Sequence, residues 1–163
     1  MAMTNEERAL LEDVTQFIYK EARFQDNHEY DAWEALWTDD GIYWIPANGE
    51  GADPENEMSI VYDNRSRISL RVRQFHTGKR LSQTPKSRLR RLVSNIEILH
   101  GEGREIVATA NAMVFESTTR GDQIWVSRNE YKLRRVDGHL RMALKKVILV
   151  NNEKPLFTLS FLI

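Results

Sequence analysis

The chain has 163 residues, a hydrophobic content of 41%, a charged content of 29% and a formal net charge of −1. This length is enough to bury one good hydrophobic core, so we predict a single domain over residues 1–163. The absence of cysteine excludes disulfides, thiolate zinc sites, iron–sulfur ligation by this chain and cysteine nucleophiles. No apolar run approaches the roughly 18 residues of a membrane span and no leader pattern is present, so we expect a cytoplasmic protein without a membrane partner.

Helices are predicted in the first part of the chain, at about residues 5–75. Thr4 and Glu7 have the spacing of a capping box, and apolar residues at helical spacing follow them. The first helix should therefore run from about Asn5 to Phe24. Apolar positions from Tyr30 to Trp37 indicate a short second helix that ends before an Asp-Asp-Gly stretch.

The middle of the chain has shorter patterns. Strands are expected at about 42–45 and 58–62, on either side of a polar, glycine-containing loop over 47–57. The residues at about 68–75 fit a helix only moderately.

The second part of the chain, at about 86–163, has the alternation of β-strands, with turn signals between its apolar runs. In the strand predicted near 139–151, Leu140, Met142 and Leu144 should face one way and Lys145 and Val147 the other. Helices packed on one face of a long, curved and mainly antiparallel sheet make an α+β domain of two layers. The predicted strands lie near 87–99, 104–118, 123–136, 139–151 and 156–162.

The charges are segregated along the chain. Residues 1–64 carry 16 acidic and 3 basic side chains, whereas residues 65–91 carry 10 basic side chains and no acid. Such a basic block can bind nucleic acid, but no helix-turn-helix pattern or aromatic RNA-binding signature accompanies it, which disfavours a nucleic-acid partner. Two interpretations stay open: the acidic and basic segments neutralise each other within the fold, or the basic block forms a charged subunit interface.

Few residues have the spacing of a catalytic or metal site. The four histidines stand singly in turns and at the ends of elements, so we expect no metal site and predict no catalytic residue. Five residues could converge on a cavity inside the curved sheet and move a proton on a small apolar substrate. The alternative, which we favour, is that the aromatic members are core residues and the aspartate lies on the surface. These cavity-lining candidates are Tyr30, Asp31, Tyr43, Trp44 and His100.

Several stretches in the same order along nearly the whole chain resemble the small (beta) subunits of bacterial aromatic-ring-hydroxylating dioxygenases, which are Rieske non-haem iron enzymes. Many members of that family have a histidine at the position of Arg91. Residues 93–98 and the lipophilic ending at 156–163 resemble benzoate-type more than naphthalene-type small subunits. The stretches that carry the resemblance are Phe17–Arg23, Tyr30–Leu36, Asp40–Pro46, Ser87–Asn95, Asp122–Arg128, Tyr131–Val136 and Leu140–Leu149.

This resemblance implies a cone-shaped fold similar to nuclear transport factor 2 and ketosteroid isomerase, also described as cystatin-like. It implies a structural subunit that binds no cofactor itself. The Rieske iron–sulfur cluster and the mononuclear iron are expected on a partner large (alpha) subunit, in an assembly of three large and three small subunits, with the sheet facing other small subunits.

Part of the basic block is expected to meet the large subunit, because guanidinium groups pair well with carboxylates at interfaces. Two other functions stay open: a stand-alone dehydratase or isomerase of the same cone fold, and a binding module similar to the transport factor. The subunit-interface candidates are Arg73, Lys79, Arg80, Arg88, Arg90 and Arg91.

Overall fold

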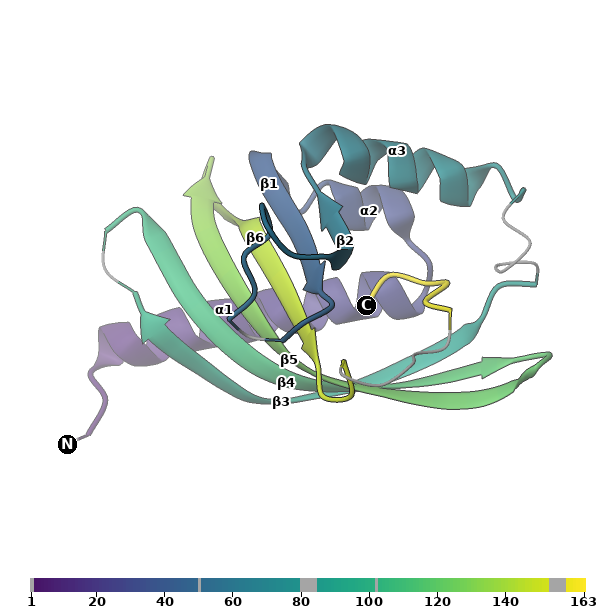
Figure 1. Cartoon of the computed structure of the whole chain (residues 1–163). Coiled ribbons are helices and arrows are strands. Elements are labelled where there is room, and N and C mark those ends of the chain that lie inside the picture. The colour runs from purple at the N-terminus through teal and green to yellow at the C-terminus, as the bar shows by residue number, and fades with distance from the viewer. Residues whose placement is uncertain (1, 50, 80–84, 102, 153–157) are drawn as a thin grey trace.

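The computed structural model describes residues 2–49, 51–79, 85–101, 103–152 and 158–163. The helices lie on one side of a curved sheet, and the two layers together have the shape of a cone (Figure 1). This two-layer α+β arrangement confirms the predicted fold. No helix in the described ranges has the length and apolar character needed to cross a membrane. The elements are α1 (Asn5–Asp26), α2 (Tyr30–Glu34), β1 (Trp37–Pro46), β2 (Ser59–Asp63), α3 (Arg65–His76), β3 (Arg88–His100), β4 (Glu105–Thr118), β5 (Gly121–Val136) and β6 (His139–Leu149).

Helix α1 begins where the capping box predicts. The Glu7 N–H donates to Thr4 Oγ1 at 3.1 Å, and the Thr4 N–H donates to the Glu7 carboxylate at 2.7 Å. The buried stripe of α1 is apolar in its first turns but also contains Glu21 and Gln25. Two polar side chains on the face that meets the sheet need polar partners inside the cone.

The predicted second helix was wrong at its end. Helix α2 stops at Glu34, and β1 already begins at Trp37, five residues before the predicted strand. The Met142 N–H donates to the Leu36 carbonyl at 2.7 Å, and Trp37 then pairs with Met142. Pairing with a distant strand therefore overrides the local helical pattern.

The sheet has the order β2-β1-β6-β5-β4-β3. β1 and β6 are parallel, and every other neighbouring pair is antiparallel. Asp137 and Gly138 both have positive φ, at 51° and 80°, and form the tight turn between β5 and β6 that the sequence indicates. The long β3–β4–β5 strands run side by side and form the curved wall of the cone (Figure 1).

The predicted alternation in β6 was wrong. Leu133 pairs with Met142 while Lys132 pairs with Leu144, so one extra residue, Ala143, stands in β6 as a bulge. A bulge shifts the strand by one residue and exchanges its two faces. Met142 faces the cone before the bulge, and Lys145, Val147 and Leu149 face it afterwards.

The predicted last strand was also wrong where the structure describes it. Residues 158–163 form no strand, and residues 153–157 lie outside the described residues. Phe161, Leu162 and Ile163 are buried and join the hydrophobic core cluster. The end of this segment lies inside the cone, between the sheet and the layer of α2 and α3 (Figure 1).

Candidate functional site

The five cavity-lining candidates do not converge on one cavity. Tyr43 faces the core, and its neighbour Trp44 faces away from it because successive strand residues point to opposite faces. The Asp31 side chain is 82% exposed and pairs with His76 at 2.8 Å. His100 is exposed at the end of β3, beside a groove that the first turns of α1 also line.

Tyr30 is buried at a separate place, near the ends of α2 and α3. Its ring stacks on Phe75, with the centroids 4.6 Å apart. His28 lies 3.0 Å from the Tyr30 hydroxyl through Nδ1 and 2.7 Å from the Ser87 carbonyl through Nε2. Burial lowers the pKa of His28 below its ordinary value, so the neutral ring, with Nε2 donating, links the α1–α2 turn to the start of β3.

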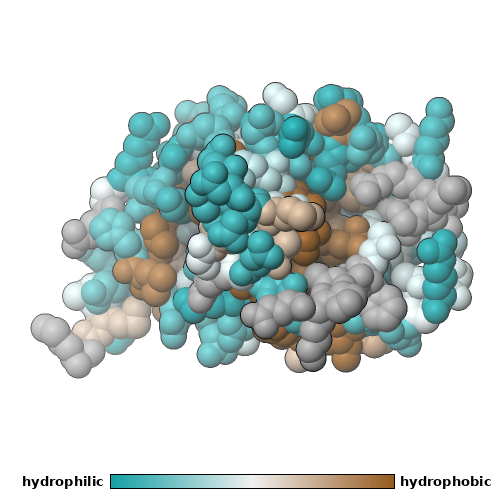
Figure 2. Space-filling view, viewed as in Figure 1, coloured by the Kyte–Doolittle hydropathy of each residue, from teal (hydrophilic) through white to brown (hydrophobic). Residues whose placement is uncertain are grey.

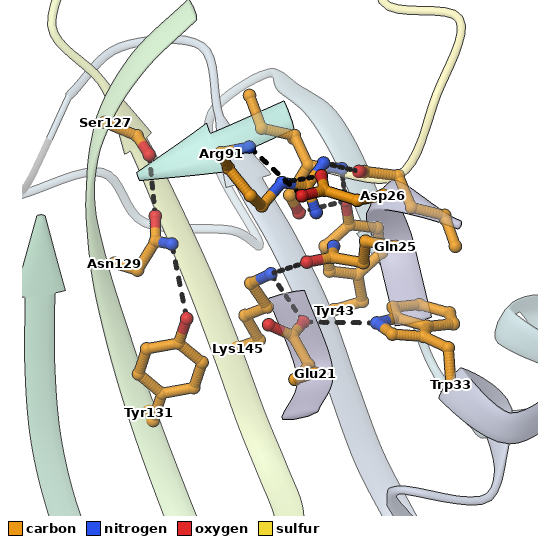
Figure 3. A network of polar contacts seen from close by, with 12 residues as sticks. Glu21, Gln25, Asp26, Trp33, Tyr43, Arg91, Ser127, Asn129, Tyr131 and Lys145 are labelled. Atoms are coloured by element: carbon orange, nitrogen blue, oxygen red, sulfur yellow. Dashed lines mark hydrogen bonds and ion pairs between the residues drawn. The ribbon is translucent and has the colours of Figure 1, made fainter. Parts of the chain in front are cut away.

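The interior of the cone holds an ion pair that the sequence did not indicate. Lys145 Nζ on β6 lies 2.6 Å from Glu21 Oε1 on α1, and the two side chains are 1% and 2% exposed (Figure 3). The Trp33 ring N–H also donates to Glu21 Oε1, at 3.1 Å, and Lys145 donates to Gln25 Oε1 at 3.3 Å. Burial lowers the pKa of Lys145, and the Glu21 carboxylate opposes this shift.

A second buried pair lies at the end of α1. Arg91 Nε on β3 is 3.1 Å from Asp26 Oδ1, and the Arg91 side chain is only 3% exposed. The Arg91 backbone N–H donates to Asp26 Oδ2 at 3.1 Å, so one carboxylate binds both the main chain and the side chain of Arg91. Arg91 Nη2 donates to the Leu162 carbonyl at 2.9 Å. The two pairs together tie the last turns of α1 to β6 in the middle of the sheet and to β3 at its edge (Figure 3).

Two tyrosines complete the polar interior. The Tyr43 hydroxyl donates to the Ile163 main-chain oxygen at 2.7 Å, and the Asn129 amide donates to the Tyr131 hydroxyl at 3.3 Å. Burial raises the pKa of both tyrosines far above their ordinary value, so both stay protonated at neutral pH. Each basic or acidic group of the interior is thus engaged by another group of the same chain, and residues 161–163 take up the space beside them.

The side chains described here do not form a metal site. Among the described residues, no group of three or more histidine, aspartate or glutamate side chains lies close enough to hold an ion. The chain also has no cysteine for an iron–sulfur cluster. The donors that the described residues offer, in a sequence without cysteine, therefore do not fit either iron centre of a Rieske dioxygenase.

The basic block is divided between the interior and the surface. Arg65 pairs with Glu34 and Arg71 with Asp63, at 2.8 and 2.6 Å, so part of the block neutralises the acidic half of the chain within the fold. The Arg91 guanidinium is buried in this chain and is not available to a partner's carboxylate, which removes it from the interface candidates. Arg80 lies outside the described residues. The exposed candidates are Arg73, Lys79, Arg88 and Arg90.

Large apolar side chains gather on the outer face of the sheet, opposite to the helices. Leu92 pairs with Met113 across β3 and β4, and Phe115 pairs with Ile124 across β4 and β5. All four are exposed, Leu92 by 72%. We call these four residues the outer apolar surface. By contrast, the surface over α3 is mostly hydrophilic (Figure 2).

Comparison with known proteins places this geometry in a family. The family model for the ring hydroxylating beta subunit matches residues 20–153. The small oxygenase component of the p-cumate 2,3-dioxygenase system of Pseudomonas putida is 30% identical over 139 residues, covering 84% of this chain and 77% of that one.

Two solved structures have the same fold. The beta subunit of benzoate 1,2-dioxygenase from Burkholderia mallei superposes with a TM-score of 0.74 at 21% identity, covering 94% of this chain and 95% of that chain. A chain of naphthalene 1,2-dioxygenase with indole bound in the active site gives 0.76 at 18% identity, covering 89% and 81%. On the family match and the p-cumate relative, this chain belongs to the family of ring hydroxylating beta subunits.

Proposed function

We propose that this chain is the non-catalytic small subunit of a cytoplasmic aromatic-ring-hydroxylating dioxygenase and that it holds the large subunits in a hetero-oligomer. One observation carries the proposal: in this family member, the protein's own side chains fill the cone. Lys145 pairs with Glu21, Arg91 pairs with Asp26, and residues 161–163 occupy the space beside these pairs. With the tail in place the cone has no role for a small aromatic substrate, so the chain contributes its surface to the complex.

In this proposal the iron–sulfur cluster and the mononuclear iron are bound by the large subunit. The absence of cysteine and the lack of a metal-holding cluster in the described residues support that division. The relatives named for p-cumate and benzoate support an aromatic carboxylate as the compound on which the whole complex acts.

The outer apolar surface is the face that we assign to other small subunits, in an assembly of three large and three small subunits. Exposed apolar side chains that adjoin one another across three strands are typical of protein–protein contacts. Leu92→Asp should therefore dissociate the small subunits without unfolding them, because its side chain makes little contact in the isolated chain. Leu70→Asp, on the exposed side of α3, is the matched control.

The exposed basic residues are the part that we assign to the large subunit. Arg88 and Arg90 are exposed at the start of β3, where Arg90 pairs with Phe115 and so borders the outer apolar surface. At this border their guanidinium groups could form bidentate pairs with carboxylates of the large subunit. Replacing both by Glu should greatly reduce co-purification of the large subunit. A control with the same charge change, Arg104→Glu with Lys132→Glu, alters exposed residues at the other end of the strands.

The test is co-expression with candidate large subunits of aromatic-ring-hydroxylating dioxygenases, followed by size exclusion with mass determination and an iron assay. The proposal expects a hetero-oligomer that contains iron only when the large subunit is present. The stand-alone enzyme would be supported instead if the chain is stable by itself, does not bind a large subunit and converts an aromatic compound alone. The described residues argue against that alternative, since Tyr43 and Tyr131 are buried and hydrogen-bonded within the chain, and the His76–Asp31 pair lies at the surface.

A further inference from the structure

The segment at residues 158–163, which we call the tail, lies in the cone as a bound peptide would. Phe161, Leu162 and Ile163 are buried, yet the described part of the chain gives the tail no backbone–backbone hydrogen bond. The Phe161 ring packs edge-on against Trp125, with the centroids 5.8 Å apart. The tail is therefore held by side chains of the cone and not by a strand ladder.

Side chains of the cone recognise the main chain of the tail at two points. Arg91 Nη2 donates to the Leu162 carbonyl at 2.9 Å. The Tyr43 hydroxyl donates to the Ile163 main-chain oxygen at 2.7 Å and accepts from the Ile163 N–H at 3.1 Å. Contacts of this kind depend on carbonyl and amide groups, which any peptide carries, and the apolar side chains fill the remaining space.

The same region has donors that the tail does not use. Arg91 Nη1 and Gln25 Nε2 are buried without a hydrogen-bond partner among the described residues. Buried donors without an acceptor cost free energy, so they favour an occupant with further acceptor oxygens. The two buried cations, on Lys145 and Arg91, are matched by the carboxylates of Glu21 and Asp26. The buried Glu116 carboxylate also lies against the tail and accepts from the Ser160 hydroxyl at 3.4 Å. The two cations are therefore not in excess over the carboxylates, and the free donors of Arg91 and Gln25 suit main-chain oxygens of an apolar segment.

We propose that the interior of the cone is a binding site for an apolar peptide segment, recognised through its main-chain carbonyls by Arg91 and Tyr43, and that the tail occupies it as an exchangeable internal ligand. This site is separate from the outer apolar surface and from the exposed arginines. It does not depend on the proposed function, because it needs neither the large subunit nor iron.

Native-state hydrogen exchange on the full chain tests the proposal, with the synthetic peptide Thr-Leu-Ser-Phe-Leu-Ile as the probe. If the tail leaves the cone without global unfolding, the amides of Leu162 and Ile163 exchange at least about tenfold faster than the central β6 amides. Added peptide then traps the vacated cone. At about ten times its Kd it should raise tail exchange about tenfold further and leave β6 exchange unchanged.

Two controls define the outcome. A peptide of the same composition in scrambled order should have no effect. Tyr43→Phe, which loses the hydroxyl that binds Ile163, should speed tail exchange, whereas Tyr62→Phe, beside Trp44 on the other face of the sheet, should not. Tail amides that exchange only as fast as β6 amides, and that do not respond to the peptide, would show the tail to be ordinary core and overturn the proposal.

Discussion

Replacing Lys145 by Met removes the cation of the most deeply buried ion pair. The Lys145 and Glu21 side chains are 1% and 2% exposed, with Nζ and Oε1 2.6 Å apart. Met fills nearly the same volume, so the main effect is a carboxylate left in the cone without its cation. Breaking a buried pair in this way costs about 3–5 kcal/mol, a large part of the roughly 5–15 kcal/mol that stabilises a typical domain.

The matched double variant separates this charge effect from a packing effect. Glu21→Gln keeps an oxygen for the Trp33 ring N–H and removes the negative charge, so Glu21→Gln with Lys145→Met leaves no charge at either position. Glu21→Gln alone leaves the Lys145 cation unpaired and should cost about as much as Lys145→Met. We expect the double variant to lose no more than about 2 kcal/mol, so the two positions are coupled by several kcal/mol.

Urea unfolding of the isolated small subunit, followed by tryptophan fluorescence and circular dichroism, gives the free energies of unfolding of the two single variants and the double variant, provided that the m-value stays constant. A loss of less than about 1 kcal/mol for Lys145→Met would refute the reasoning. Additive losses in the double variant would refute it as well, because they would mean that the two groups do not interact.

Three further predictions each concern one residue. The lowered pKa of His28 means that the folded state prefers the neutral ring. The contribution of His28 to the free energy of unfolding is therefore complete above the ordinary pKa of 6.5 and is lost as the pH falls through the lower folded value. Urea midpoints measured at several pH values should fall on acidification, and they should fall less for His28→Gln. Gly41→Ala places a Cβ 2.7 Å from Cε3 of the buried Trp37 ring and should lower the free energy of unfolding by about 1–3 kcal/mol, whereas an unchanged thermal midpoint would contradict this clash. Leu92→Asp should change the free energy of unfolding by less than about 0.5 kcal/mol while it reduces the mass of the assembly in light scattering.

The sequence predicted the features that depend on residues close together in the chain. The capping box of Thr4 and Glu7 and the turn at Asp137 and Gly138 are confirmed, because a cap joins residues three apart and a tight turn needs positive φ at neighbouring positions. The two-layer fold is confirmed as well, since helical and alternating periodicity record which face of each element is buried.

Only the tertiary structure decided which polar residues face the cone. A bulge at Ala143 turns Lys145 inward, and the apolar pattern of β6 gives no sign of it because both faces of that strand are largely buried. Arg91 looks like a surface cation in a basic block, yet the end of α1 brings Asp26 against it from 65 positions away in the chain. Burial of a charge depends on such a distant partner, whereas local periodicity reports only the faces of one element, so the ionic interior and the tail within it could not be read from the sequence.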